Sequence, residues 1–414
     1  MQKPTLFGYG LTTKAIAKKL GGGCTFFDDN CKETYTDENH NVIKPSHLFN
    51  PDESLLEVTT PSLSPKHPLI QKAKNLLSEY DYFLGRVGIP AHHGGQECPP
   101  YTIWISGTNG KTTTTQMLTH ILEKRGAVSG GNIGTPLADL STDSSIWVLE
   151  SSSFTLHHTH TASPNIYLLL PITPDHLDWH GTPEQYEADK LKPLLTMKEG
   201  ELALVPKGLN LPKTNAYVVE YDTNAFIAEY FKLDSSKLRF KAAFLQDALL
   251  ALAVSKVLFD EADYALMNTF TLDEHRQEEV FDAQNRLWIN DSKATNLDAT
   301  IQAVKGYADK HIHLILGGDD KGVDLAPLFE EMKSLKLTLY TIGENNNKLL
   351  ALAKTYHVAY VESKTIDLAI QEIDKVHTTQ SIALLSPAAA SFDQFKSYKH
   401  RGDTFKELIK DLQK

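Results

Sequence analysis

The chain has 414 residues, enough for two or three domains of roughly 150 residues each, and its 41% hydrophobic and 22% charged content is that of a globular protein. Its 41 lysines and arginines against 52 aspartates and glutamates give a formal charge of −11, whereas a protein that binds nucleic acid through phosphates is normally basic. These numbers exclude a small disulfide-stapled protein and a disordered one, and they predict a chain without nucleic acid as a partner.

Nothing in the sequence predicts a membrane segment or a disulfide framework. No apolar run approaches the roughly 20 residues that cross a bilayer, and the first ten residues contain no hydrophobic targeting segment. Cys24, Cys31 and Cys98 are odd in number and lack metal-ligand spacing, which indicates reduced thiols. We therefore expect a cytoplasmic protein without membrane insertion, and a monomer.

The first block of the chain predicts a strand, a helix and a second strand within thirty residues. A strand from Thr5 is followed by a glycine turn at 8–10, a helix over 14–20 and a strand from Thr25. This order is typical of Rossmann-type units, although the turn lacks the third glycine of a dinucleotide-binding fingerprint. Glycine, proline and polar residues crowd together at 88–100, where we expect the first domain to end.

The second and third blocks each predict a five-stranded open sheet. Apolar runs that suit strands covered on both faces lie at 101–106, 145–149, 165–170, 201–205 and 216–220, with a helix at 244–259. Five more lie at 286–289, 313–316, 337–342, 358–361 and 382–385. The predicted fold class is α/β with three domains: a Rossmann-like N-terminal domain at 1–92, a central P-loop-type ATPase domain with a parallel sheet at 93–270, and a Rossmann-like C-terminal domain at 271–414.

A phosphate-binding loop is predicted directly after the strand at 101–106. The loop residues are Gly107, Thr108, Asn109, Gly110, Lys111, Thr112 and Thr113. Glycines let backbone N–H groups converge on a phosphate at the start of a helix, the lysine reaches the terminal phosphates, and the first threonine hydroxyl is available to Mg²⁺. The spacing departs from the eight-residue G-x-x-x-x-G-K-[ST] pattern, and the plain alternative is a loop with a chance Gly-Lys-Thr.

Two further polar groups follow predicted strands of the same block. Glu150 ends the strand at 145–149, and His176 lies in an Asp- and His-rich segment after the strand at 165–170. Ligands of open α/β sheets bind at the carboxyl edge of the strands, and carboxylate oxygens suit Mg²⁺. Each residue taken alone has an ordinary alternative: a solvated strand-end glutamate and a structural histidine.

The combination of these motifs resembles the Mur ligase family, which makes the amide bonds of the peptidoglycan stem peptide. The motifs are Gly-Thr-Asn-Gly-Lys-Thr at 107–112, Gly-Asn-Ile-Gly at 131–134, Glu-Ser-Ser-Ser-Phe at 150–154, Asp-His-Leu-Asp at 175–178 and Tyr-Glu-Ala-Asp-Lys-Leu at 186–191. Segments at 275–276, 290–296, 316–321 and 386–395 resemble the C-terminal domain of the member that adds D-glutamate to UDP-N-acetylmuramoyl-L-alanine. The resemblance spans nearly the whole chain.

The resemblance implies an ATP-dependent ligase that acts through an acyl phosphate and a tetrahedral intermediate, in cytoplasmic peptidoglycan precursor synthesis. It implies that Lys111 stabilises the transferring phosphate and that two Mg²⁺ ions bind, one at Thr112 and Glu150 and the other at Glu150, His176 and a carbamylated Lys190. A carbamate supplies an anionic oxygen to a hard cation. Without this modification, Lys190 is a solvated helix lysine.

The resemblance also assigns the substrate contacts. The nucleotide would contact the phosphate loop and Asp247, Arg276, Asp291 and Lys293. The UDP substrate would contact Leu11, Thr12, Asp28, Asp29, Asn30, Asn132 and Ser152. D-Glutamate would contact Thr295, Lys321, Ser391, Phe392 and Tyr398.

Three positions depart from the family pattern. Asn30 stands where an arginine that contacts uracil is usual, Thr155 where a glutamine is usual, and Asp247 where an asparagine that contacts adenine is usual. An ionised aspartate accepts hydrogen bonds but cannot donate them. Recognition of uracil and adenine must therefore differ in detail from the family pattern.

Three other functions remain as alternatives. A sister Mur-type or folylpolyglutamate-type ligase would use the same loop with another amino-acid acceptor, and the segment at 290–296 together with Lys321 argues for D-glutamate. A nicotinamide-dependent dehydrogenase would leave Lys111 unused. A protein that uses nucleotide binding only as a switch would not need three domains whose strands end in polar residues.

Overall fold

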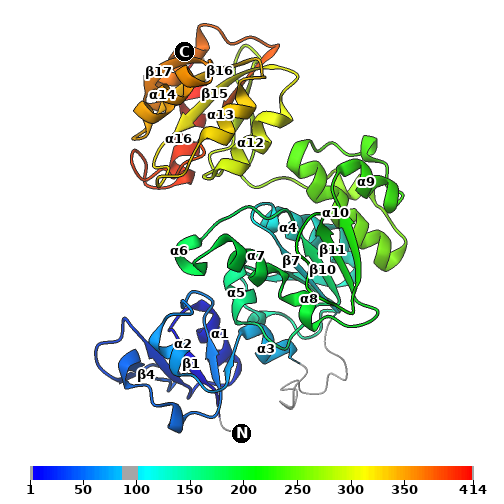
Figure 1. Ribbon diagram of the computed structural model, residues 1–414, viewed down its shortest axis with the longest axis vertical. Helices are drawn as coiled ribbons and strands as arrows, with labels where there is room; N and C mark the ends of the chain where they lie inside the picture. The colour runs from blue at the N-terminus through cyan, green and yellow to red at the C-terminus, as the bar shows by residue number, and fades with distance from the viewer. Residues whose placement is uncertain (1–2, 86–100, 413–414) are drawn as a thin grey trace. The chain divides into compact units, whose positions relative to one another are not determined.

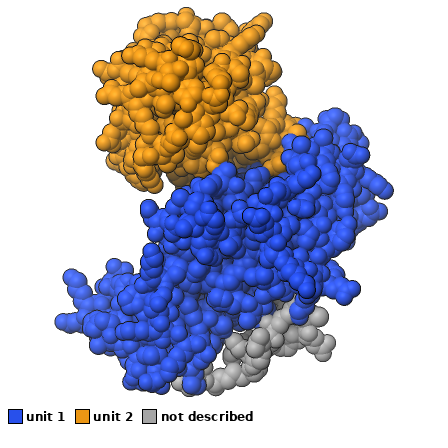
Figure 2. Space-filling model, in the orientation of Figure 1, with its two compact units in different colours: residues 1–238, 247–268 blue, residues 239–246, 269–414 orange. Residues whose placement is uncertain are grey.

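The computed structural model describes residues 3–85 and 101–412, and these fall into two compact units (Figure 2). The first unit comprises residues 1–238 and 247–268, and the second comprises 239–246 and 269–414. The expected boundary at 88–100 lies outside the described residues, so the three-domain division at 92 and 270 stays a prediction.

The N-terminal sheet of the first unit confirms the predicted order of strand, helix and strand (Figure 1). Its strand order is β3 (Tyr35–Thr36), β4 (Val42–Pro45), β2 (Thr25–Asp28), β1 (Thr5–Phe7), β5 (Glu57–Thr59) and β6 (Leu76–Leu77), with only β3 antiparallel to its neighbour. The accompanying helices are α1 (Leu11–Lys19), α2 (Pro68–Lys72) and α3 (Glu79–Leu84). Helix α1 thus begins three residues earlier than expected, directly after the glycine turn.

The central sheet of the first unit is parallel throughout. Its strand order is β12 (Tyr217–Tyr221), β11 (Leu202–Pro206), β10 (Ile166–Leu169), β7 (Tyr101–Ser106), β9 (Ile146–Glu150) and β8 (Ala127–Gly131). The five predicted strands are present, and β8 is an additional one. Buried Trp104, Trp147 and Tyr167 form its core with aliphatic neighbours, as expected for a parallel sheet covered on both faces.

Strand register brings the polar strand ends of the central sheet together. Ile105 of β7 pairs with Glu150 of β9, and Ser106 of β7 pairs with Leu169 of β10. Gly131 of β8 also pairs with Glu150. Because all these strands are parallel, the segments that follow them leave the sheet at one edge.

The helices of the central region include one long apolar helix. They are α4 (Lys111–Leu122), α5 (Ser153–His158), α6 (Leu177–His180), α7 (Pro183–Leu191), α8 (Pro193–Thr196), α9 (Asn224–Tyr230), α10 (Ala242–Phe259) and α11 (Tyr264–Met267). Helix α10 has the length and mean hydropathy, 1.7, of a membrane-crossing helix. Half of it is buried within the protein, and a core helix of a soluble protein has the same properties.

The third sheet, in the second unit, is a parallel sheet with one antiparallel edge strand. Its order is β13 (Glu278–Phe281), β14 (Leu287–Asn290), β18 (Ser381–Leu385), β15 (His311–Gly317), β16 (Leu337–Ile342) and β17 (Ala359–Lys364). The five predicted strands are present, and β13 is the additional antiparallel one.

Both faces of the third sheet are covered by helices. Helices α12 (Leu297–Gly306), α13 (Ala326–Met332) and α14 (Asn346–Thr355) contribute to one hydrophobic cluster, and α15 (Ile366–Asp374) and α16 (Tyr398–Asp411) contribute to another. Neighbouring residues of β15 alternate between them, since Leu314 belongs to the first cluster and Ile315 to the second. This arrangement is the doubly covered α/β domain that the sequence predicts.

Candidate active site

The predicted phosphate loop joins β7 to helix α4. Gly107 has φ +141°, and a Cβ there would lie 2.5 Å from Leu170 Cβ. Gly110 has φ +83° and caps the N-terminus of α4. Only glycine tolerates this combination of backbone angle and close approach, so the chain can turn from strand to helix with its N–H groups at the helix N-terminus. The predicted strand, loop and helix are thus confirmed.

Lys111 is held by the loop itself. Its Nζ donates to the carbonyl oxygens of Gly107 at 3.0 Å and of Thr108 at 2.8 Å. Thr112 is half-buried at the first turn of α4, whereas Thr113 is buried. The helix N-terminus therefore carries one fixed ammonium and one hydroxyl that remains accessible, which suits an anionic ligand.

Glu150 presents a buried carboxylate oxygen that receives no hydrogen bond from any described residue. Its side chain is part of a residue only 3% exposed, and Oε1 accepts a hydrogen bond of 2.9 Å from Asn132 Nδ2. Among the residues that the structure describes, Oε2 has no hydrogen-bond partner. Burying an ionised oxygen without a partner is costly, and a bound cation would remove that cost. Glu150 therefore fits a metal ligand better than a solvated strand-end glutamate.

His176 lies just before α6 in a left-handed backbone conformation, with φ +53°. Its ring packs against Phe154 with centroids 4.9 Å apart, and about half of its side chain is exposed. Desolvation and the positive charge of Lys111 lower the pKa of His176, against the opposite effect of Asp175. The imidazole is therefore neutral near pH 7, which is the state that binds a metal.

Lys190 is buried, unlike the solvated lysine of the ordinary alternative. Only 1% of the residue is exposed, and its Nζ donates to the carbonyl oxygen of Gly107 at 2.7 Å. Burial first, and then the charge of Lys111, lower its pKa well below the usual range. The two lysines thus share one acceptor in the phosphate loop.

Asp247 lies behind the phosphate loop. Its Oδ1 accepts a hydrogen bond of 3.0 Å from Thr114 Oγ1 in α4, and a Cβ on Gly110 would lie 2.8 Å from the same oxygen. The predicted adenine contact is therefore a buried residue that anchors helix α4 to α10.

A cavity of about 270 Å³ lies at the carboxyl ends of the N-terminal strands. Its lining includes the predicted Asp28, Asp29 and Asn30, and adds Gly8, Tyr9, Gly10, Phe27, Thr60, Ser62, Leu63 and Leu69. Asp29 forms an ion pair of 2.8 Å with His67, a residue that carried no sequence signal. Leu11 and Thr12 begin α1 beside this cavity, and Ser152 caps α5 by accepting from Thr155 N at 3.1 Å.

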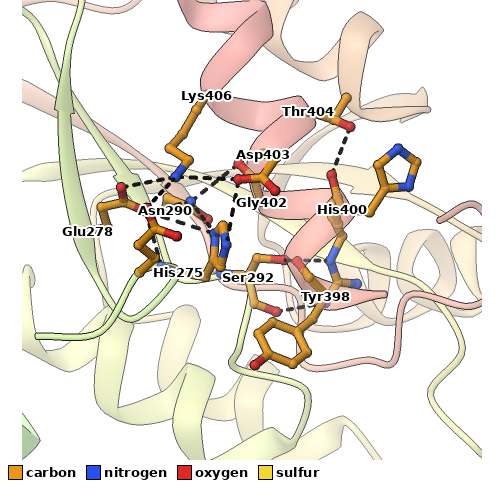
Figure 3. Close-up of polar contacts among 12 residues, drawn as sticks. His275, Glu278, Asn290, Ser292, Tyr398, His400, Gly402, Asp403, Thr404 and Lys406 are labelled. Carbon is orange, nitrogen blue, oxygen red and sulfur yellow. Dashed lines mark hydrogen bonds and ion pairs between the residues drawn. The ribbon is translucent and has the colours of Figure 1, made fainter. Parts of the chain in front are cut away.

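In the second unit, polar contacts join His275 and Asn290, which neighbour the predicted nucleotide contacts in the sequence, to Gly402 and Asp403 of helix α16 (Figure 3). Asn290 Nδ2 lies 2.9 Å from His275 Nδ1, and the carbonyl oxygen of His275 accepts from Lys293 N at 3.1 Å. The Lys293 ammonium lies over the Tyr398 ring, 5.6 Å from its centroid. Lys293, predicted to contact the nucleotide, thus lies beside Tyr398, predicted to contact D-glutamate.

Arg276 and Asp291 are both largely buried. Arg276 Nε is 3.9 Å from Asp273, and it has no hydrogen-bond partner within the described part of the chain. Asp291 accepts from Gln277 N at 3.2 Å and from Ser386 Oγ at 2.9 Å. Burial raises the pKa of Asp291 to about 7, so about half of its carboxyl groups carry a proton at neutral pH.

The predicted D-glutamate contacts lie in neighbouring segments of the second unit. An antiparallel bridge joins Asp319 to Ala390, which brings the turn of Lys321 beside the segment of Ser391. Lys321 and Phe392 are exposed, as is Thr295, whereas Ser391 is buried.

The sequence did not predict the role of Arg401, which holds together the segments that carry the predicted D-glutamate contacts. The Arg401 guanidinium is buried and donates to Ser292 Oγ at 3.0 Å, to the Ser292 carbonyl oxygen at 2.9 Å and to the Ala389 carbonyl oxygen at 3.1 Å. It therefore ties the segments at 290–296 and 386–391 to α16.

Comparisons with known proteins show which family the chain resembles. Residues 105–246 match the Mur ligase middle domain. A Campylobacter jejuni protein named UDP-N-acetylmuramoylalanine–D-glutamate ligase is 46% identical over 99% of this chain and 100% of its own length. A Helicobacter pylori protein of the same name is 45% identical over 98% of this chain and 99% of its own.

Solved structures show the same fold at low sequence identity. The MurF ligase of Thermotoga maritima in complex with ADP aligns with a TM-score of 0.58 and 13% identity, over 99% of this chain and 98% of that one. An Escherichia coli FolC structure with DHPP and ADP aligns over 75% of this chain and 89% of that one, with a TM-score of 0.51 and 14% identity.

Proposed function

The chain belongs to the Mur ligase family and is an ATP-dependent ligase that adds D-glutamate to UDP-N-acetylmuramoyl-L-alanine in peptidoglycan synthesis, and we propose that the strand ends of its central sheet form the catalytic centre. The observation that carries this proposal is that three groups meet at one edge of the central sheet. Lys111 and Lys190 both donate to Gly107, directly after β7. Glu150, whose Oε2 has no hydrogen-bond partner among the described residues, ends the neighbouring strand β9.

The first chemical step is transfer of the terminal phosphate of ATP to the alanyl carboxylate. An oxygen of the carboxylate attacks the phosphorus, the bond to ADP breaks, and an acyl phosphate forms. This reaction depends mainly on positioning and charge neutralisation. Lys111 and the N–H groups at the start of α4 stabilise the transferring phosphate. The loop already holds Lys111 in place, so little reorganisation is needed.

The second step is attack of the D-glutamate amine on the acyl carbon. A tetrahedral intermediate forms, loses a proton from nitrogen and expels inorganic phosphate. Thr295, Lys321, Ser391, the Phe392 backbone and Tyr398 position the two carboxylates of the amino acid. Arg276, Asp291 and Lys293 contact the nucleotide. In the first unit, the cavity beside Asp28, Asp29 and Asn30 holds the uridine diphosphate part of the substrate.

The chemistry of the donor groups fits Mg²⁺, which when bound offsets the negative charge of the phosphates. Thr112 and Glu150 would hold one ion, and Glu150, His176 and a carbamate on Lys190 would hold a second. The carbamate forms when the neutral amine of Lys190 attacks CO₂ and releases one proton. Burial supports this modification, because it keeps the amine neutral.

We further propose a cytoplasmic monomer that serves cell shape and cell division.

The deciding experiment measures phosphate release by the purified chain with ATP, Mg²⁺ and UDP-N-acetylmuramoyl-L-alanine. We expect release that requires D-glutamate, with L-glutamate and other amino acids inactive, and loss of about 10²-fold or more in Lys111→Ala. Lys207→Ala, at an exposed surface position, is the matched control. Release with another amino acid would assign a sister ligase, and release without any acceptor would indicate a nucleotide switch.

A further inference from the structure

Three short helices of the first unit meet at one carboxylate that the ligase mechanism does not use. Asp189 of α7 lies 2.9 Å from His157 Nδ1 of α5 and 2.7 Å from His180 Nδ1 at the end of α6. The ligand atoms of these three residues all lie within 4.8 Å of one another. The His180 side chain is fully buried, that of Asp189 is 4% exposed and that of His157 is 25% exposed. The cluster is thus closed on most sides and open at His157.

We propose that His157, His180 and Asp189 form a binding site for one transition-metal cation of the zinc class. Two imidazole nitrogens and one carboxylate oxygen are ligands that such cations prefer, with a fourth position left for water. Bond lengths of about 2.0–2.2 Å in a tetrahedral site separate neighbouring ligand atoms by roughly 3.3 Å. The distances from Asp189 to the two imidazole nitrogens, 2.9 and 2.7 Å, must therefore lengthen by about half an ångström to admit the ion.

The protons of the two imidazoles have acceptors in the metal-bound state. Each neutral ring carries its single proton on Nε2 when Nδ1 binds the cation. His180 Nε2 lies 2.9 Å from Ser153 Oγ, which accepts that proton in a hydrogen bond. The more exposed His157 ring can donate to solvent. Binding by the neutral rings therefore releases no proton from them and leaves no buried N–H unpaired.

The surroundings orient the three ligands. Gln185 Nε2 donates to Asp189 Oδ1 at 2.9 Å, so the carboxylate is held from a second direction. The Trp179 ring lies 4.5 Å from the ring of His180 and 5.1 Å from that of His157, and Phe154 stacks on His180 at 5.5 Å. Such supporting contacts fix ligand geometry, and removing one typically costs about 10- to 100-fold in metal affinity.

This site differs in chemistry from the Mg²⁺ sites proposed at Glu150. A pair of imidazoles favours zinc-class ions, whereas Mg²⁺ favours oxygen ligands and retains its water. Asp189 immediately precedes Lys190, and His180 ends the helix that follows His176. A bound ion would therefore brace both segments without entering the reaction.

The test uses the untagged full chain, stripped of metal by dialysis and titrated with Co²⁺ as a spectroscopic probe. We expect one equivalent of Co²⁺ to bind with the visible absorption of a tetrahedral site, to be displaced by Zn²⁺, and to be unaffected by excess Mg²⁺. His157→Gln and His180→Gln should lose the absorption, and Ser153→Ala should weaken binding about tenfold. His160→Gln, at an exposed position just past α5, should bind as the wild type does.

Circular dichroism of each variant checks that it is folded. His157→Gln is the variant that should disturb the fold least, because His157 is the most exposed of the three ligands. Absence of the cobalt spectrum in the wild type, or its retention in both His157→Gln and His180→Gln, would overturn the proposal and leave the cluster as a hydrogen-bonded clamp. Because the readout is metal binding rather than phosphate release, it does not depend on the proposed ligase mechanism.

Discussion

The carbonyl oxygen of Gly107 accepts hydrogen bonds from both Lys111 and Lys190. Two ammonium groups at one oxygen repel each other, and the buried one has less water to stabilise its charge. Burial first, and then the charge of Lys111, account for the lowered pKa of Lys190, which gives that residue a reactive neutral amine.

Lys190 should carry a carbamate when CO₂ is present. We expect a carbamate resonance in the ¹³C NMR spectrum of the protein equilibrated with labelled bicarbonate, and its loss in Lys190→Arg. Lys198→Arg, at an exposed lysine, should keep the resonance. Because the pKa of Lys190 is depressed, its carbamate should persist to lower pH than one on an exposed lysine. A spectrum identical in both variants would contradict this assignment.

Glu150→Gln should abolish most of the activity without unfolding the protein. The glutamine amide oxygen can still accept a hydrogen bond from Asn132, but the substitution removes the negative charge that would bind Mg²⁺. We expect kcat/KM to fall by about 10²- to 10³-fold and the Mg²⁺ concentration for half-maximal rate to rise. Phosphate-release kinetics at several Mg²⁺ concentrations measure both. Glu199→Gln, at an exposed position, is the control, and an unchanged Mg²⁺ requirement would count against Glu150 as a ligand.

At the scale of secondary-structure elements, the long apolar strands were predictable, whereas several short strands were not: β3 to β6 in the N-terminal sheet, β8 in the central sheet and β13 in the third. Strand β8 has the sequence Ala-Val-Ser-Gly-Gly, in which two glycines weaken any strand signal. Strand β13 has the sequence Glu-Glu-Val-Phe and is an edge strand with alternating exposure, so it lacks the continuous apolar run of its neighbours. Both strands form because their tertiary partners supply the missing interactions.

Site residues were predictable from the sequence where they lie in one contiguous motif or in the segment after an apolar strand, as Glu150 and His176 do. The phosphate loop forms a single motif at 107–113, so its geometry followed from local rules. His157, His180 and Asp189 come from three helices, and Arg401 reaches Ser292 across 109 residues. Such contacts depend on how the helices pack, and no local spacing encodes them. The burial of Lys190 was missed for the same reason.

Helix α16 approaches His275 so closely that a side chain at Gly402 cannot fit. A Cβ there would lie 2.2 Å from His275 Nδ1 and 3.0 Å from Asn290 Oδ1. We expect Gly402→Ala to destabilise the second unit by about 1–3 kcal/mol, since overpacking forces the backbone or the ring to move. Urea denaturation measures the change. Glu407→Ala, on the exposed side of the same helix, should have little effect, and equal stability of both variants would refute the steric argument.

At the scale of the whole molecule, acid should destabilise the second unit through two buried histidines. Burial lowers the pKa of both His313 and His377 to about 4, whereas the unfolded chain takes up these protons near pH 6.5. Their contribution to stability is therefore lost as pH falls from about 6.5 to about 4. The raised pKa of Asp291 acts in the opposite direction between about pH 7 and 4.

Comparison with His313→Gln isolates the histidine contribution. We expect the free energy of unfolding to fall less between pH 7 and pH 4.5 in this variant than in the wild type, because one titrating group is removed. Urea denaturation at both pH values, followed by circular dichroism, provides the measurement. An equal fall in both proteins would show that His313 is not kept neutral by burial.

The placement of Trp179 gives the chain an internal optical reporter. Three of its four tryptophans, Trp104, Trp147 and Trp288, are buried in sheet cores, where the emission maximum of tryptophan lies at shorter wavelengths than in water. Trp179 alone is partly exposed, and it lies against the rings of His157 and His180. Metal binding at these imidazoles should therefore quench the fluorescence of Trp179, so that occupancy of the proposed metal site can be followed without any added label.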